Sequence, residues 1–480
     1  MKSLAKNSLF NALYQVLNLL FPLISSMYVA RTLMPEGVGR VAYAQNITSY
    51  FVTAAALGIP TVGIRVISLA RDDRTKLNKS FSELVLLNAI STAIALSIYA
   101  VLILNTPSLK TDILLYIATG TVILFNFINI DWFYKGQEEY VYIVIRSIVT
   151  KIISIIALFV FVHTPDDYIL YAIISSLAIC GNYVFNILRS RNYVTFQLRG
   201  LNIAQHIKPV LLVAGSLFLS EIYSKLDTTM LGSMIGDESV GYYSYAHKVL
   251  QIGIGFCAAI TAAFLPRLSY YYENNREQFL ALVTQGTRIT SFLAIPASVG
   301  LFLLAPEAVS LLFGPEFLSA AQTLRIFAIL IVVFSFGNLL CYQMMLCSGS
   351  EKKHVLILAC AATTNIILNS ILIPRLQHNG AAVASVCTEL FINLVEGIYF
   401  KRKLRLRYDM QAIWQAILST AVMGVCILLV KRVAGTSALA FVFCIISGVC
   451  AYAAMNILLK NSLTLEALAI IRNKVFHKGK

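Results

Sequence analysis

The sequence predicts an all-α membrane protein of about 14 transmembrane helices, with two parallel pseudo-repeats of six helices and two extra C-terminal helices. Composition is the first reason, because 58% of the 480 residues are hydrophobic and only 13% are charged. The mean hydropathy is +0.76, and apolar windows of about 20 residues recur, each long enough to cross a ~30 Å hydrocarbon core as a helix. An internal repeat and the distribution of positive charge are the other two reasons.

The internal repeat is centred on residues 36–44, which reappear without a gap at residues 238–246. Glu, Val, Gly, Tyr and Ala coincide within this stretch, and the register persists as far as the pair Arg65 and Arg267. A gapless register across a loop, an apolar helix and the next loop indicates two homologous halves. We therefore expect the function to be located between the halves.

Hydropathy places the predicted spans near residues 8–31, 39–64, 81–104, 112–133, 141–163, 168–188, 209–231, 240–265, 281–304, 320–346, 354–374, 380–400, 413–431 and 438–459. The corresponding domains are an N-terminal six-helix lobe (1–190), a basic cytoplasmic linker (191–208), a second six-helix lobe (209–400), and a basic loop with helices 13 and 14 and a tail (401–480).

Positive charge predicts the orientation of these spans. With both termini in the cytoplasm, the cytoplasmic segments carry 27 Lys and Arg residues and the outer loops carry six. This asymmetry follows the positive-inside rule, and it makes the two halves enter the membrane in the same direction. The net charge of +15 is explained by topology, so it does not indicate nucleic-acid binding.

The sequence carries no pattern typical of a metal site or an enzyme. Its nine cysteines include no CxxC pair and no nearby His at ligand spacing, so neither a metal nor a cofactor is expected. No catalytic Ser/His/Asp or Cys/His constellation and no Walker-type glycine loop is apparent, so we expect a transporter that is not driven by ATP.

Polar side chains recur at helical spacing on spans 1, 2, 7 and 8, where they predict either a water-filled lumen or hydrogen bonds between helices. The candidate lumen residues are Asn11, Gln15, Asn18, Asn46, Ser220 and Tyr245. Near two of these spans, the loops 35–39 and 237–241 carry Gly37, Gly39 and Gly241, which predict either hinges or ordinary turns.

Charged residues inside the spans are costly, so they indicate function or pairing. The cations Lys225, Lys248 and Arg288 indicate an anionic ligand, whereas the alternative pairs Lys225 with Glu221 one turn away and lets Arg288 snorkel. Three acidic residues are candidates for coupling to an ion: Glu221, Asp227 and Glu389. For Glu389 the alternative is a structural ion pair with Lys151 or Arg288.

Six motifs carry a family resemblance: residues 30–39 (ARTLMPEGVG), 131–140 (DWFYKGQEEY), 225–232 (KLDTTMLG) continuing to 240–243 (VGYY), 264–269 (FLPRLS), 313–317 (FGPEF) and 379–382 (NGAA). With these motifs the chain resembles the polysaccharide-unit flippases (Wzx type) of the multidrug/oligosaccharidyl-lipid/polysaccharide exporter superfamily. The resemblance covers residues 1 to about 400, and the last two spans share only hydropathy with the family.

The resemblance implies a V-shaped pair of lobes, with spans 1, 2, 7 and 8 lining a central cationic cavity. It implies a cell-membrane flippase that moves a polyprenyl-diphosphate-linked oligosaccharide from the inner to the outer leaflet by alternating access. Lys225, Lys248 and Arg288 would then meet the diphosphate, and the polar stripes would meet the sugars. Besides this cargo and membrane lipid, the implied partners are a polysaccharide polymerase or other assembly proteins.

Two alternatives within the superfamily remain. A flippase for peptidoglycan lipid II or a teichoic-acid-type precursor comes second, because the chain lacks the early Arg-Asp pair associated with lipid II flippases. A multidrug antiporter comes third, since that branch usually has twelve spans and favours cationic cargo.

Overall fold

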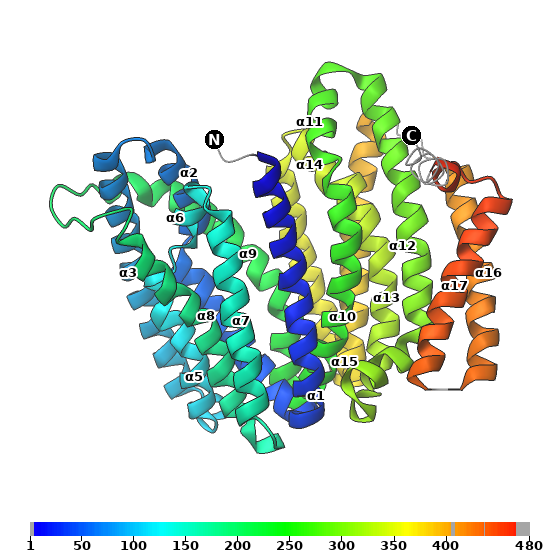
Figure 1. The fold of residues 1–480 in the computed structure, drawn as a ribbon, viewed down its shortest axis with the longest axis horizontal. Coiled ribbons are helices and arrows are strands. Elements are labelled where there is room, and N and C mark those ends of the chain that lie inside the picture. The colour runs from blue at the N-terminus through cyan, green and yellow to red at the C-terminus, as the bar shows by residue number, and fades with distance from the viewer. Residues whose placement is uncertain (1–3, 405–408, 436, 467–480) are drawn as a thin grey trace, which may run out of the picture. The chain divides into compact units, whose positions relative to one another are not determined.

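The computed structural model describes residues 4–404, 409–435 and 437–466; within these ranges the side chains of 4–20, 259–260, 401–404 and 434 are not described. All regular secondary structure in these ranges is helical (Figure 1). The chain forms two compact units, Met1–Gly241 and Tyr242–Lys480. The sequence-based division at the 191–208 linker stays a prediction, whereas the boundary between the compact units lies after Gly241.

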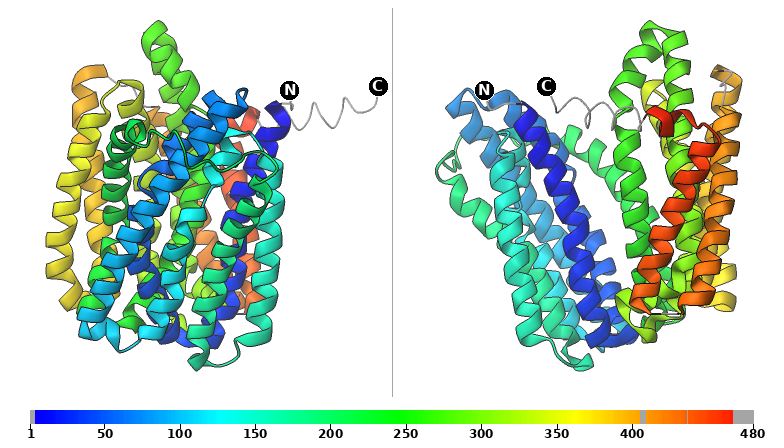
Figure 2. Two further views of the ribbon diagram at one scale, coloured as in Figure 1. Left: turned by 90° about the vertical axis from the view of Figure 1, so that its left-hand side faces the viewer. Right: turned by 45° about the vertical axis from the view of Figure 1, so that its right-hand side comes forward.

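The helices of the first unit run side by side (Figures 1 and 2). In order, they are α1 (Leu4–Ala56), α2 (Ile59–Ala70), α3 (Arg74–Asn105), α4 (Pro107–Lys110), α5 (Ile113–Leu124), η1 (Phe125–Ile128), α6 (Asp131–Gly136), α7 (Tyr140–Phe161), η2 (Pro165–Asp167), α8 (Tyr168–Ser190) and α9 (Ala204–Met234). The next helix, α10 (Asp237–Ala262), begins in this unit and continues into the second.

The second unit continues from α10 with helices of very different length. They are α11 (Leu265–Asn274), α12 (Arg276–Phe313), η3 (Pro315–Phe317), α13 (Ala320–Gly337), η4 (Asn338–Tyr342), α14 (Gln343–Cys347), α15 (Glu351–Leu404), α16 (Met410–Ala434) and α17 (Ala438–Leu458). The segment η4 is a π-helix, a rare form that often marks functional positions. The pair α11 and α12 extends beyond the neighbouring helices of this unit (Figures 1 and 2).

Ten helical segments of the described ranges are long and apolar enough to cross a membrane. Two of these segments, Phe21–Ala70 and Glu351–Phe400, have 50 residues each. At 1.5 Å per residue each is about 75 Å long, enough for two crossings of a ~30 Å core. The prediction of an all-α, multi-pass membrane protein is confirmed, and the number of 14 spans stays a prediction.

Both of these long segments are interrupted at a predicted boundary between spans. In α1, Met34 has φ 59° and ψ 173°, and in α15, Gln377 has φ 51° and ψ −132°. Such positive φ values end a helix, and Pro35, which lacks an N–H donor, follows the first break directly. Each interruption lets the chain fold back as two consecutive helices.

The predicted motif at residues 131–140 forms part of the core of the first unit. Trp132, Phe133 and Tyr134 are each at most 1% exposed and pack around Phe81 in one hydrophobic cluster. The guanidinium of Arg146 donates to Asp131 at 2.8 Å. This part of the motif therefore stabilises the fold.

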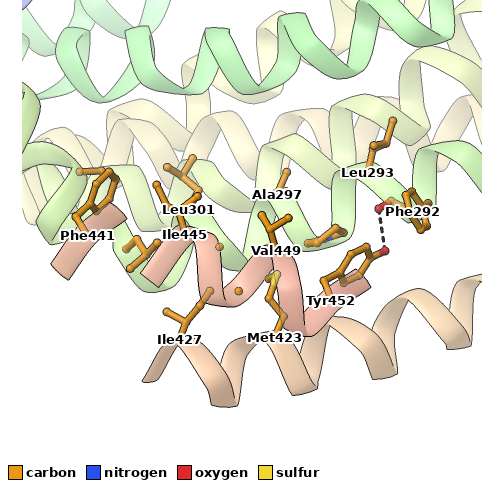
Figure 3. A pocket seen from close by; sticks show the side chains of 15 residues that line it. Phe292, Leu293, Ala297, Leu301, Met423, Ile427, Phe441, Ile445, Val449 and Tyr452 are labelled. Carbon is orange, nitrogen blue, oxygen red and sulfur yellow. Dashed lines mark hydrogen bonds between the residues drawn. The ribbon is translucent and has the colours of Figure 1, made fainter. Parts of the chain in front are cut away.

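In the second unit α16 and α17 pack against α12 around an apolar cavity of about 420 Å³ (Figure 3). Its lining includes Leu301, Met423 and Ile445 (Figure 3). The Tyr452 hydroxyl donates to the Phe292 carbonyl at 2.8 Å. Because the Tyr452 hydroxyl is bonded to this carbonyl, the surfaces that line the cavity are almost entirely hydrocarbon. Such a cavity suits an apolar ligand.

Candidate functional site

The predicted lumen residue Asn46 lies in a contact between α1 and α9. It is 4% exposed, and its amide donates to the Thr229 hydroxyl at 2.7 Å and to the Lys225 carbonyl at 3.3 Å. Thr229 in turn donates to the same carbonyl at 3.0 Å, so it accepts from the Tyr50 hydroxyl at 2.7 Å. At this position the polar residues act as a hydrogen-bonded contact between helices, the alternative to a lumen.

Further toward its N-terminus, α9 presents an open polar face. Only 6% of the apolar 18-residue stretch that defines α9 as a candidate span is buried. This is the smallest share among the ten candidate spans of the described ranges. Ser220 is exposed, and Ser224 is exposed with its hydroxyl bonded to the Ser220 carbonyl at 2.9 Å. This face leaves hydroxyl groups accessible to a solute.

The charged residues Glu221 and Lys225 in the middle of α9 are half-buried, and they do not form the pair that was the alternative to an anionic ligand. Across the described residues, no ion pair within 4.0 Å joins Glu221 to Lys225, although four residues separate them. Asp227 is half-buried on the same helix. The alternative that assigned Lys225 to Glu221 therefore has no support in the side-chain geometry.

Three predicted lumen residues, Asn11, Gln15 and Asn18, lie outside the residues whose side chains are described. Their backbone belongs to α1.

On α10, the Lys248 ammonium lies 4.0 Å from the ring centroid of Tyr245, a cation–π contact. Tyr245 itself is 1% exposed and packs against Phe313 and Phe317. Lys248 is half-buried, and no acidic side chain of the described ranges pairs with it. This lysine remains a candidate for an anionic ligand, and the ring of Tyr245 positions its ammonium group.

Arg288 has a carboxylate partner that local spacing did not reveal. Its guanidinium donates to Asp409 at 2.7 and 3.0 Å and to the Ser462 hydroxyl at 3.1 Å. The backbone N–H of Ala412 and the guanidinium of Arg288 hold the pKa of Asp409 below its ordinary value of 3.8. Since Arg288 is partly neutralised, it is a weaker candidate for an anionic ligand than Lys248.

The acidic residue Glu389 is half-buried on α15. Two turns further on, Glu396 is 1% exposed, and its carboxylate lies 2.6 Å from Nδ1 of His354 at the start of the same long helix. The break at Gln377 lets these two residues meet although 42 positions separate them. The sequence did not predict this pair, because its hydropathy divides α15 into two separate spans.

The break in α1 lies beside a cluster of charges. Arg40 donates to Glu36 at 2.7 Å and to the Tyr168 hydroxyl at 3.4 Å, and it lies 3.8 Å from Asp237. Tyr168 donates to Asp112 at 3.2 Å. All of these groups except Glu36 line a mostly polar cavity of about 420 Å³.

At the same end residues 35–39 and 237–241 touch through glycines. The prediction that these stretches are loops is wrong, because both are helical, the first directly after the break in α1 and the second in the first turns of α10. A Cβ on Gly39 would collide with the Asp237 carbonyl, and one on Gly241 would collide with the Pro35 carbonyl. Neither glycine has a positive φ. Both glycines therefore allow two backbone segments to approach each other closely. The unusual backbone dihedrals of this region are those of Met34 and not those of the glycines.

The matches with known families place the chain in a class of membrane proteins. The model of the family "Polysaccharide biosynthesis protein" matches residues 4–271, more than half of the sequence. A second family model, MatE, matches residues 213–371. This class comprises the multi-pass, all-helical membrane proteins of the Wzx-type exporter superfamily. The chain belongs to the polysaccharide biosynthesis protein family.

Two curated relatives match most of the chain. A protein of Escherichia coli (strain K12) named "Putative O-antigen transporter" is 25% identical over 81% of this chain and 95% of its own length. The "Capsular polysaccharide biosynthesis protein CapF" of Staphylococcus aureus is 24% identical over 84% of this chain and its full length.

Solved structures support the fold. The lipid II flippase MurJ in an inward closed conformation superposes with a TM-score of 0.76, at 15% identity, over 96% of this chain and all of the other. An inward-facing multidrug transporter of the MATE family gives 0.64, at 15% identity, over 80% and 94%. At this identity the likeness establishes the fold alone.

Proposed function

We propose that the protein is a flippase that moves a polyprenyl-diphosphate-linked oligosaccharide repeat unit from the inner to the outer leaflet by alternating access. The observation that carries the proposal is the sequence likeness to a named O-antigen transporter and a capsular polysaccharide protein, each along more than four fifths of the chain. The chain is a transporter and not an enzyme, in line with the names of its relatives.

In this proposal both termini lie in the cytoplasm and the protein resides in the cytoplasmic membrane. The distribution of Lys and Arg between predicted loops supports that orientation. The predicted halves, residues 1–190 and 209–400, form the two repeats, and the 401–480 segment adds the last helices. A polysaccharide polymerase or other assembly protein is the partner that receives the unit.

Lys248 and Lys225 are the proposed contacts for the diphosphate. A cation about 4 Å from a unit charge contributes about 4 kcal/mol at an effective dielectric constant near 20, before desolvation is subtracted. The absence of a carboxylate within 4.0 Å of either lysine, among the described residues, supports this role. Arg288 contributes less because Asp409 already accepts two of its hydrogen bonds.

The sugars are proposed to meet polar groups along α1 and α9. Ser220 offers an exposed hydroxyl, and Asn11, Gln15 and Asn18 continue the predicted stripe on α1. Asn46 and Tyr245 are buried, so in this proposal each holds its neighbouring side chains in position and does not contact the sugars directly.

The remaining parts of the proposal concern the lipid tail and the energy source. The cavity between α12, α16 and α17 is apolar and suits part of a prenyl chain. Glu221, Asp227 and Glu389 are the acidic residues proposed to couple transport to a cation gradient. All three are half-buried in membrane helices, where an ionisable group is costly and functional by default.

The test is transport in reconstituted vesicles. Purified protein is incorporated with defined polyprenyl-diphosphate oligosaccharides, and a lectin or glycosidase added outside measures their arrival in the outer leaflet. Lys248→Ala is expected to reduce the rate by two orders of magnitude or more, as follows from a loss of a few kcal/mol. Lys248→Arg keeps the charge and retains part of the rate. The matched control is Ser97→Ala, which removes an exposed hydroxyl of α3 that bonds only to its own helix and should transport normally.

One observation favours a second candidate, a cation antiporter, because the MatE family model matches residues 213–371. An antiporter for cationic drugs needs a carboxylate in its lumen, and Glu221 has no ion-pair partner among the described residues. Normal oligosaccharide transport by Lys248→Ala, together with loss of drug resistance in Glu221→Gln, would favour the antiporter over the flippase.

A further inference from the structure

The segment between α8 and α9 is an extended strap that runs along the start of α3. In Figure 1 it is the green loop beside the upper end of α3. Three of its backbone N–H groups donate to side chains of α3: Thr195 to Asn78 Oδ1 at 3.0 Å, Gln197 to Ser82 Oγ at 2.9 Å, and Asn202 to Glu83 Oε1 at 2.7 Å. The strap, which we define as residues 191–203, therefore has a fixed position on α3.

The carboxylate of Glu83 also anchors the end of the strap. It is fully buried, and it accepts from Gln205 at 2.7 Å and lies 2.8 Å from Nε2 of His206, both in the first turn of α9. These contacts hold the strap at both its middle and its end.

The sequence of α3 gives the depth of the strap relative to the membrane. All four charged residues of α3 lie in its first ten positions, and the run Leu84–Leu104 is uncharged. That run has 21 residues and is about 31 Å long, which matches the ~30 Å hydrocarbon core. Asn78, Ser82 and Glu83 therefore lie within about 10 Å outside the hydrocarbon edge, in the headgroup layer.

At that depth the strap exposes two large apolar side chains. Phe196 is 52% exposed and Leu198 is 72% exposed. Val194, two residues before Phe196, is buried in the core cluster around Trp132. The strap thus turns one apolar side chain into the protein and leaves the next two outside.

Unpaired positive charge lies on the strap and on the ends of α3 and α9 that adjoin it. Arg191, Arg199, Lys79 and Lys208 are exposed, and no acidic residue of the described ranges pairs with any of them. Arg189 differs, since it lies 3.7 Å from Glu139 and over the ring of Tyr142. The strap and the adjoining ends of α3 and α9 therefore combine exposed hydrocarbon with four exposed cations.

The surface continues onto the first turns of α9. A shallow hollow of about 460 Å³ is lined by Ile207, Leu211 and Leu212, with Lys208 and Ala204 beside them. Both leucines are more than half exposed. An acyl chain fits the apolar walls while a lipid phosphate meets the lysine.

We propose that the strap is a membrane-interface anchor, in which Phe196 and Leu198 insert between lipids while Arg191, Arg199, Lys79 and Lys208 bind the phosphates of anionic lipids. Interfacial anchors combine inserted apolar side chains with basic residues, and the depth given by α3 places both groups at the boundary where they are needed. A protein partner would meet only two exposed apolar side chains, together with four cations that are better suited to binding phosphates. The inference is independent of the cargo, because it concerns only this segment and the surrounding bilayer.

The experiment uses the full-length protein in nanodiscs, with its nine cysteines replaced and one fluorescent probe attached at Leu198→Cys. The nanodiscs contain equal fractions of phosphatidylcholine and phosphatidylglycerol, and only one of the two carries brominated acyl chains. We expect bromine to quench the probe at Leu198, and brominated phosphatidylglycerol to quench it more than brominated phosphatidylcholine. A matched control places the probe at Asp166→Cys, an exposed position in the short polar segment η2 of the same unit, where little quenching is expected.

The charges are tested with the double variant Arg191→Gln, Arg199→Gln. Each basic residue near an anionic surface changes lipid affinity about fivefold, so the double variant should reduce the preference for phosphatidylglycerol by about 25-fold. Quenching at Leu198 no greater than at Asp166 would overturn the anchor. Equal quenching by the two brominated lipids in the wild-type chain would overturn the role of the cations, and this comparison needs no charge variant to fold.

Discussion

The side-chain amide of Asn46 on α1 donates to the hydroxyl of Thr229 on α9 across 2.7 Å. This bond, with the one from Tyr50 to the same hydroxyl, joins the first helix of the chain to a helix that the repeat assigns to the second half. The prediction that Asn46 belongs to a polar stripe led to two interpretations, and the geometry favours a contact between helices at this position.

We expect Thr229→Val to weaken this contact, because valine keeps the shape of threonine and removes the hydroxyl. Side-chain hydrogen bonds between membrane helices contribute about 0.6 kcal/mol on average and at most about 2 kcal/mol. A double-mutant cycle with Asn46→Ala, measured by unfolding in mixed micelles, should give a coupling free energy of this size. The control is Ser216→Ala, which breaks only a bond within α9, and a coupling of zero between Asn46 and Thr229 would contradict the contact.

Substituting Gly39 or Gly241 with alanine should prevent the helical segments 35–39 and 237–241 from meeting. Each added methyl group would collide with a backbone carbonyl, and a backbone cannot move aside as a flexible side chain can. We expect Gly39→Ala to lower the melting temperature and to make a cysteine at Ser239, now 6% exposed, react faster with an impermeant thiol reagent. Gly215→Ala is the control, because a Cβ there meets nothing within 4 Å.

The ion pair of Arg288 with Asp409 predicts a loss of stability in acid. The pKa of Asp409 is lower in the folded protein than its ordinary value of 3.8, so the carboxylate binds protons more weakly when folded. Its contribution is therefore fully present above about pH 4 and is lost as the pH falls through the folded value. Thermal unfolding between pH 6 and pH 3 should show a steeper loss in the wild type than in Asp409→Asn, and parallel curves would exclude this contribution.

Filling the apolar cavity between α12, α16 and α17 should show whether this cavity contributes to transport independently of Lys225 and Lys248. A Cβ on Gly300 would lie 4.0 Å from Met423, an ordinary contact, so Gly300→Leu can occupy the cavity without forcing the backbone apart. We expect the melting temperature to hold or rise while transport of prenyl-linked cargo falls. Gly397→Leu adds the same volume where a Cβ meets nothing within 4 Å, and it should leave transport unchanged. Unchanged transport in Gly300→Leu would remove the cavity from the mechanism.

Sequence reasoning succeeded where the physics is local. Long apolar runs predicted the membrane helices, and the breaks at Met34 and Gln377 fall where the hydropathy profile places a boundary between spans. Pro35 beside the first break explains why, since it removes a hydrogen bond from the helix whatever its surroundings are. Such signals depend only on neighbouring residues, and a single sequence contains them.

It failed where partners are distant along the chain. The spacing of four residues suggested Glu221 as an ion-pair partner of Lys225, but no such pair forms among the described residues. The partner of Arg288 is Asp409, which lies 121 positions away in the sequence. Helical periodicity gives the face of a helix and not the helix that it meets. The candidate site could therefore be outlined by residue type, and its individual contacts required the three-dimensional structure.

The strap between α8 and α9 also has a practical consequence for building hybrid transporters from relatives. A crossover within residues 191–203 would pair the α3 of one protein with the strap and α9 of another, and the bonds of Asn78, Ser82 and Glu83 would then depend on foreign partners. A crossover after Gly241 keeps all of them within one parent, along with the bond from Asn46 to Thr229. Recombination experiments that exchange cargo preference should therefore recover more functional hybrids from the second joint than from the first.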